Sequence, residues 1–274
     1  MTQFSEYFSS LSLLRSAFRD LESIFEKLNP NQPLLRTRLV AVSSDLECIS
    51  ELCGNSFLEC TSWSRHVSER QYELEAKVPV LSTQEYSELQ EYQIRLYNGG
   101  KPLSEAEDAR YTELSSKMQN YSQEFSSAIE NDIACGLDAH VKKSEAILKA
   151  NVRAFLFSCR SYQDAIYALY LVSKRKQPGQ HSSVHDGLKG AEFRSAIAAI
   201  PGYVDWFNKL RELRNLAKVG ATCGVGLGGQ EVTVSYDDAR NDRVVKVGGN
   251  DFSFLDLSRS MEMSARFTKL VTRS

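Results

Sequence analysis

Apolar side chains recur at intervals of three and four residues along most of the chain, and this period predicts amphipathic helices. The pattern holds over residues 4–28, 35–52, 83–97, 104–132, 139–173, 188–199, 203–217 and 254–271. The second of these helices is expected to end at the Gly54-Asn55 pair, because glycine followed by a turn-forming residue favours a break. Residues 56–82 show no clean period, so a strand, a helix and a loop all remain open there.

The pattern changes after residue 220, where apolar and polar residues alternate over 231–236 and again over 243–247. Alternation with a period of two on both sides of a turn-rich segment predicts a β-hairpin. We therefore expect a mainly α-helical fold, a helical bundle with a C-terminal β-hairpin and a closing helix. A boundary near residue 135 would divide the chain into an acidic helical N-terminal region, 1–135, and a second region, 136–274.

Three glycines, Gly224, Gly226 and Gly229, satisfy the pattern GxGxxG. A dinucleotide-binding fingerprint follows a strand and opens a helix, so that the helix N-terminus meets the pyrophosphate. Here the segment follows a helix and opens a strand, so we interpret it as a flexible connection and predict no cofactor. The patterns GxxxxGK[ST], HExxH and GxSxG are absent from the sequence, which disfavours the commonest nucleotide-binding, metalloprotease and hydrolase classes.

Cysteine usage and hydropathy point to an intracellular protein. The 274 residues can form a core without disulfides, so the six cysteines are expected to be reduced thiols. A zinc site built from Cys48, Cys53, Cys60 and His66 lacks the usual CxxC-type pair, and we predict no metal. The longest apolar run, 165–172, is too short for a membrane span, and no basic stretch precedes an apolar one at the N-terminus. A cytoplasmic location without membrane association is therefore expected.

Charge is strongly segregated along the chain. Residues 1–140 contain 12 basic and 22 acidic residues, residues 141–220 contain 14 and 6, and residues 221–274 contain 7 of each. Clustered Lys and Arg gain affinity for polyanions by releasing counterions, so the basic block predicts a surface for phosphate or nucleic acid. The other interpretation is that acidic and basic regions pack against each other or form a dimer contact.

Within the basic block, Arg160 and Asp164 are spaced for an ion pair along one helix face. Arg211 and Lys218 lie on the flank of the helix predicted over 203–217. The residues predicted to bind nucleic acid are Arg153, Arg160, Arg211, Arg214, Asn215 and Lys218.

The segment 154–165, followed one helix later by Trp206-Phe207 and 210–215, resembles the core of HEPN-like domains over about residues 139–220. The resemblance implies a bundle of four to five helices, often dimeric, from prokaryotic conflict and stress systems. Active members carry an arginine, a polar residue and then a histidine after four to six positions. Arg214 and Asn215 match the first half, but the candidate histidine positions 219–221 hold Val, Gly and Ala. Without a proton acceptor, acid–base cleavage by that motif is not expected.

The leading prediction is a nuclease-inactive HEPN-like module of a bacterial defence or toxin–antitoxin type system, which binds RNA or a partner protein. A homodimer is expected to form through the aromatic faces of 139–173 and 203–219. One alternative is a metal-independent ribonuclease in which His181 or His185 acts with Arg214. Another is a helical scaffold whose acidic N-terminal helices bind a basic protein.

Overall fold

The structure is a computed structural model that describes residues 2–25, 33–77, 80–97, 102–134, 137–179, 182–219, 222–226, 232–237 and 249–273. It is mainly α-helical with a small antiparallel sheet and a closing helix, as predicted. The helices are α1 (Thr2–Phe25), α2 (Pro33–Glu75), α3 (Thr83–Tyr97), α4 (Glu105–Ala134), α5 (Leu137–Ser173), α6 (Val184–Gly187), α7 (Ala191–Ile197), α8 (Tyr203–Val219) and α9 (Phe254–Thr272). The strands are β1 (Thr222–Gly226), β2 (Thr233–Asp237) and β3 (Asp251–Ser253).

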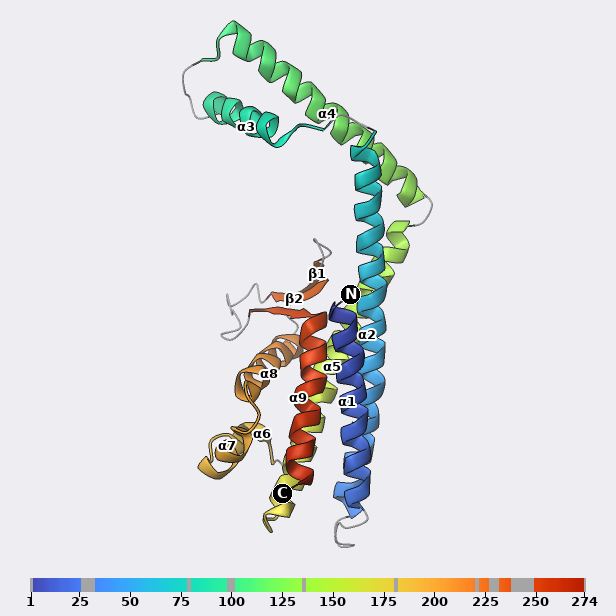
Figure 1. Ribbon diagram of the computed structural model, residues 1–274, viewed down its shortest axis with the longest axis vertical. Helices are drawn as coiled ribbons and strands as arrows, with labels where there is room; N and C mark the ends of the chain where they lie inside the picture. Colours follow the sequence, from blue (N-terminus) through green and yellow to red (C-terminus); the bar gives the residue numbers. More distant parts are fainter. Residues whose placement is uncertain are drawn as a thin grey trace. The chain divides into compact units, whose positions relative to one another are not determined.

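The chain forms two compact units, one of residues 1–61 with 144–274 and one of residues 62–143. This division differs from the predicted boundary near residue 135. The reason is that α1 packs along α9, which brings the N-terminal helix into the same unit as the C-terminal region (Figure 1). Sequence composition reflects local charge, whereas the units are set by packing between distant segments.

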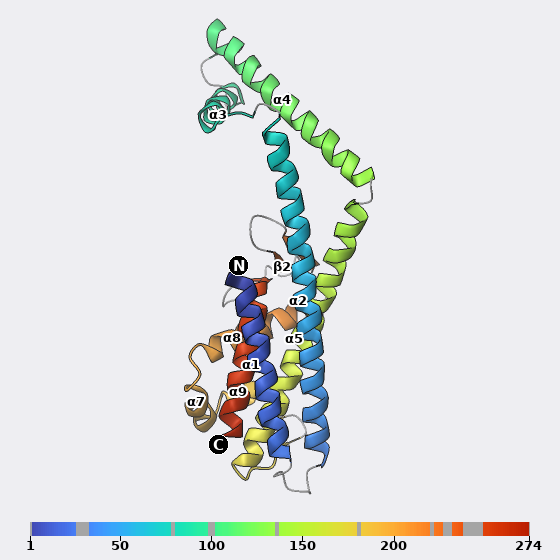
Figure 2. The same cartoon turned by 45° about the vertical axis from the view of Figure 1, so that its right-hand side comes forward.

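Aromatic side chains hold the first unit together. Phe254 at the start of α9 contacts Phe4 and Tyr7 of α1, with ring centroids 5.7 and 5.0 Å apart. Phe18 of α1 packs against Tyr162 of α5 at 5.3 Å. Figure 2 shows α1 beside α9 from a second direction. Burial of such large apolar surfaces supplies the main stabilisation of a helical bundle.

The faces predicted to form a dimer are covered within a single chain. Tyr162 is fully buried, and Tyr167 and Trp206 are at most 9% exposed. The Trp206 indole N–H donates to the Ser260 hydroxyl of α9 at 3.0 Å. Because these aromatic side chains already pack on α9 and its neighbours, they are not available for a second copy.

Helix α2 does not end at Gly54-Asn55. It continues to Glu75, so most of the segment 56–82, for which the sequence did not decide between strand, helix and loop, is helical. A Cβ at Gly54 would overlap the ring of Tyr7. The glycine is therefore needed for the close approach of α1 and α2, and the predicted break was wrong because a packing glycine resembles a helix terminator in sequence. The helix predicted over 188–199 is present in shorter form as α7, and the short helix α6 precedes it.

The sheet has the strand order β1-β2-β3, and both pairings are antiparallel. A C-terminal hairpin is present, but β2 pairs with β1 in the register Cys223 to Tyr236. The second predicted strand, 243–247, lies outside the described residues. Gly224 and Gly226 belong to β1 and so form a paired strand, while Gly229 is also outside the described residues.

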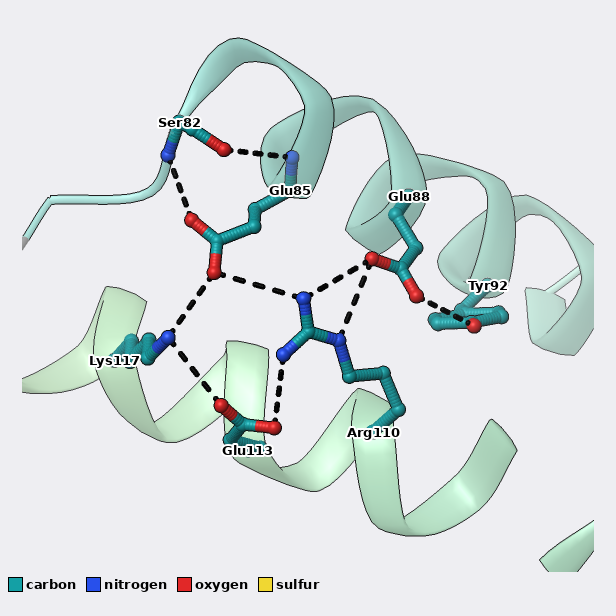
Figure 3. Close-up of polar contacts among 7 residues, drawn as sticks. All are labelled: Ser82, Glu85, Glu88, Tyr92, Arg110, Glu113 and Lys117. Carbon is teal, nitrogen blue, oxygen red and sulfur yellow. Dashed lines mark hydrogen bonds and ion pairs between the residues drawn. The ribbon is translucent and has the colours of Figure 1, made fainter. Parts of the chain in front are cut away.

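In the second unit, α3 and α4 pack together as an antiparallel helix pair (Figure 1). Leu89 and Leu114 are buried between them. A capping box begins α4, since the Ser104 amide donates to Glu107 at 2.7 Å and the Glu107 amide donates to the Ser104 hydroxyl at 3.4 Å. A row of ion pairs lies beside the apolar seam (Figure 3), and Arg110 contributes to it with carboxylates of both helices.

Candidate functional site

The predicted ion pair on α5 is the centre of a polar cluster between α5 and α8. The Arg160 guanidinium lies 3.1 Å from the Asp164 carboxylate, and their side chains are only 11% and 20% exposed. The same guanidinium lies over the Phe207 ring of α8, 4.8 Å from its centroid. A cation over an aromatic face is attracted by the ring quadrupole, so Phe207 helps to fix Arg160.

Two further arginines of α8 belong to this cluster. Both Arg211 and Arg214 lie near enough to Arg160 to lower its pKa, together with burial, which is the larger cause. We call Arg160, Arg211 and Arg214 the arginine cluster. The charge of Arg214 also acts on the carboxylate of Asp164, so Asp164 faces guanidinium groups of both α5 and α8.

Two donors of the arginine cluster are left without an acceptor. The Nη1 of Arg160 and the Nε of Arg214 are buried and have no hydrogen-bond partner among the described residues. The other end of Arg214 is bound, since its Nη2 donates to the Asn215 side-chain oxygen at 2.9 Å. Buried charged donors without acceptors are costly, so these two atoms mark a position where an anion would be stabilised.

Asp164 connects this cluster to α6. Its Oδ1 accepts a hydrogen bond from the Val184 amide, the first residue of α6, at 3.0 Å. Burial raises the pKa of Asp164, and the Arg160 guanidinium opposes that rise. The carboxylate therefore fixes both a guanidinium and a helix start, and we expect its removal to disturb both.

His185 lies on α6 beside the arginine cluster. Its pKa is lowered from 6.5 by burial first, and then by the positive charges of Arg211 and Lys189. The imidazole is therefore neutral at pH 7 and able to accept a proton. His181, the other predicted candidate, lies outside the described residues.

The remaining predicted residues are spread around the cluster. Arg153 and Lys218 are exposed. Arg153 lies near β2, because its charge lowers the pKa of Tyr236 against the larger effect of burial. Val219, one of the positions where the resemblance expects a histidine, is an exposed residue at the end of α8, and positions 220 and 221 lie outside the described residues.

No group of three metal-ligating side chains is found among the described residues. Cys53 and Cys60 of the rejected zinc set are buried in the core, and burial raises the pKa of both thiols. Among the helices that the structure describes, none is long and apolar enough to cross a membrane.

Sequence reasoning identified the Arg160–Asp164 pair and the basic residues of α8. It missed the roles of Phe207 and Val184, because both depend on contacts between helices. No local signal in the sequence places an aromatic ring of α8 over a guanidinium of α5.

Comparison of the chain with protein-family models, curated proteins and solved structures finds no match.

Proposed function

We propose that this protein is a binding module for RNA, and that its binding face is formed by α5 and α8 around the arginine cluster. One observation carries the proposal. Arg160 is paired with Asp164 within reach of the charges of Arg211 and Arg214, and two buried N–H donors of the arginine cluster have no acceptor among the described residues. Phosphate oxygens are the acceptors that guanidinium groups pair with most strongly.

Exposed cations on the same two helices extend the face. Arg153 lies two helical turns from Arg160 along α5, a distance of about 10 Å. Lys218 follows Arg214 by about one turn on α8. Such spacing suits successive phosphates of a single strand, whose contacts are sequence-independent and weaken as salt rises.

The test compares two triple variants in RNA-binding titrations over a range of salt. Arg153, Arg211 and Lys218 are replaced together by Ala, while Arg160 and Arg214 are kept because they are packed into the fold. For a single strand, loss of three phosphate contacts lowers the slope of log affinity against log salt by about 2. The matched control replaces three exposed arginines in α9 and at its C-terminal cap, Arg259, Arg266 and Arg273, and should leave the slope unchanged.

An absence of binding at low salt, or equal slopes in both triple variants, would refute the RNA-binding proposal. The first outcome favours the scaffold alternative, in which the acidic N-terminal helices bind a basic protein. Placement in a bacterial defence or toxin–antitoxin type system rests on the resemblance to HEPN-like domains and stays a prediction.

A metal-independent ribonuclease is the second candidate function, and one specific observation favours it. His185 is neutral at pH 7 and lies beside two guanidinium groups, which is the combination of proton acceptor and phosphate-binding cation that such cleavage needs. The assay is RNA cleavage in the presence of EDTA. Cleavage that is lost in His185→Ala would establish the ribonuclease, and intact RNA supports the binding module.

A further inference from the structure

Four residues of helix α3 form a palindromic pattern, in which Tyr, Gln, Gln and Tyr follow one another with the same spacing from either end. Tyr86, Gln90, Gln93 and Tyr97 are separated by four, three and four residues. At about 100° per residue, these spacings place all four within one narrow face of the helix. We call this face the tyrosine–glutamine stripe.

The stripe is exposed and apolar at both ends. Tyr86 is 45% exposed and Tyr97 is 85% exposed, and Ile94 beside them is 60% exposed. Large apolar side chains gathered on one exposed face indicate an interaction surface more than single scattered ones do.

The stripe is also free of charge, although α3 contains four charged residues. Glu85 and Glu88 pair with Arg110 of α4 (Figure 3), and Arg95 pairs with Glu107 at 2.8 Å. The fourth, Glu91, lies about 130° around the helix from the centre of the stripe. All four charges are thus turned away from the stripe.

We propose that the tyrosine–glutamine stripe is the contact between two copies of this chain, with the two α3 helices antiparallel. A two-fold axis midway between Gln90 and Gln93 places Tyr86 against Tyr97 of the second copy. It also places Gln90 against Gln93 of the second copy, and two amide groups can each donate and accept. A two-fold contact requires a self-complementary surface, and the palindromic stripe meets this requirement.

The lack of charge on the stripe argues against a charged partner and is compatible with a second copy. A basic or acidic partner would be recognised by charges, and the stripe presents none. A contact between identical charged faces would repel itself, whereas this face does not. One helix face per copy is smaller than a standard interface of about 800 Å² per partner, so the dimer is expected to dissociate in the micromolar range.

Sedimentation velocity between about 1 and 200 µM tests the contact, a range suited to a small interface. Tyr97→Glu buries an unpaired carboxylate in the dimer and should raise its dissociation constant by about tenfold or more. Leu34→Glu is the matched control, because Leu34 of α2 is also 85% exposed and lies outside α3. Circular dichroism checks that both variants keep their helices.

A second pair of variants tests the antiparallel direction. In Gln90→Lys with Gln93→Lys, every facing pair is lysine against lysine, and the dimer should be lost. In Gln90→Lys with Gln93→Glu, the lysine at 90 faces the glutamate at 93 of the second copy, and the dimer should be restored at low salt. In a parallel pair, residue 90 would face residue 90 of the second copy and residue 93 would face residue 93, so both double variants would place equal charges opposite each other. Loss of the dimer in both double variants therefore refutes the antiparallel contact. A wild-type protein that is monomeric at 200 µM, or a Tyr97→Glu dimer as strong as wild type, refutes the proposal as a whole.

Discussion

Replacing Gly54 by Ala tests whether the close approach of α1 and α2 holds the first unit together. A Cβ at this position would lie 2.6 Å from Cε2 of Tyr7 and still closer to Cζ and the hydroxyl. Tyr7 has little room to move, because it is 2% exposed, and its ring stacks on Phe254 at 5.0 Å. Its hydroxyl also donates to the Ser50 carbonyl at 3.3 Å.

Two effects oppose each other in this variant. Alanine is favoured over glycine in a helix interior by about 1 kcal/mol. Overpacking of a filled core costs about 1–3 kcal/mol, and loss of the Tyr7 hydrogen bond adds about 1 kcal/mol. The overpacking terms outweigh the helix propensity, so we expect Gly54→Ala to lower the free energy of unfolding by about 1–3 kcal/mol.

Urea denaturation followed by circular dichroism measures this change as a lower midpoint at unchanged slope. Gly224→Ala is the control, since a Cβ there meets no atom within 4 Å. In a Tyr7→Leu background the shorter side chain leaves room, and Gly54→Ala should become stabilising. A Gly54→Ala protein as stable as wild type, with Tyr7 in place, would show that the helices do not need this glycine.

Three further predictions concern the candidate site and the α3–α4 pair. Asp164→Ala leaves a buried guanidinium unpaired and should lower the free energy of unfolding by about 3 kcal/mol in urea titrations, with a smaller loss for Asp164→Asn; equal stability of all three proteins would contradict the buried pair. In an NMR titration His185 should have a pKa below 6.5, and Arg211→Gln should raise it; a pKa unmoved by that change would remove Arg211 from the site. The pKa values of Glu85 and Glu107 are lowered to about 2 by their hydrogen bonds and ion pairs, so their stabilisation of the α3–α4 pair is full above pH 4.5 and is lost as the pH falls toward 2. The protection factors of α3 amides, taken relative to the intrinsic exchange rate at each pH, should therefore fall over that range, and protection that persists at pH 2 would contradict it.

The helices were predictable where side-chain period alone decides the structure. The bounds of α3 agree with the prediction, because a regular apolar pattern lies between a capping serine and a glycine pair. The Arg160–Asp164 pair was predictable for a similar reason, since a spacing of four residues on one helix fixes the distance.

Other features could not be read from the sequence because they depend on contacts between distant segments. Gly54 has the local signature of a helix break, and only the ring of Tyr7, 47 positions away, gives it a packing role. His185 and Arg211 come together because Asp164 holds the start of α6 against α5. Neither spacing nor composition carries that information, since the intervening turns set the geometry.

The same contacts place the proposed binding face and the proposed proton acceptor next to each other. Burial lowers the pKa of His185, and the charges of Arg211 and Lys189 lower it further, which keeps the imidazole neutral at pH 7. A bound phosphate would offset the charge of Arg211 and so favour the protonated imidazole. We therefore expect proton uptake by His185 to accompany anion binding in either proposed function. A ribonuclease must in addition place that imidazole within hydrogen-bond reach of the attacking hydroxyl, whereas a binding module needs only the charge. Because Asp164 fixes α6 through the Val184 amide, the position of His185 is set by the fold.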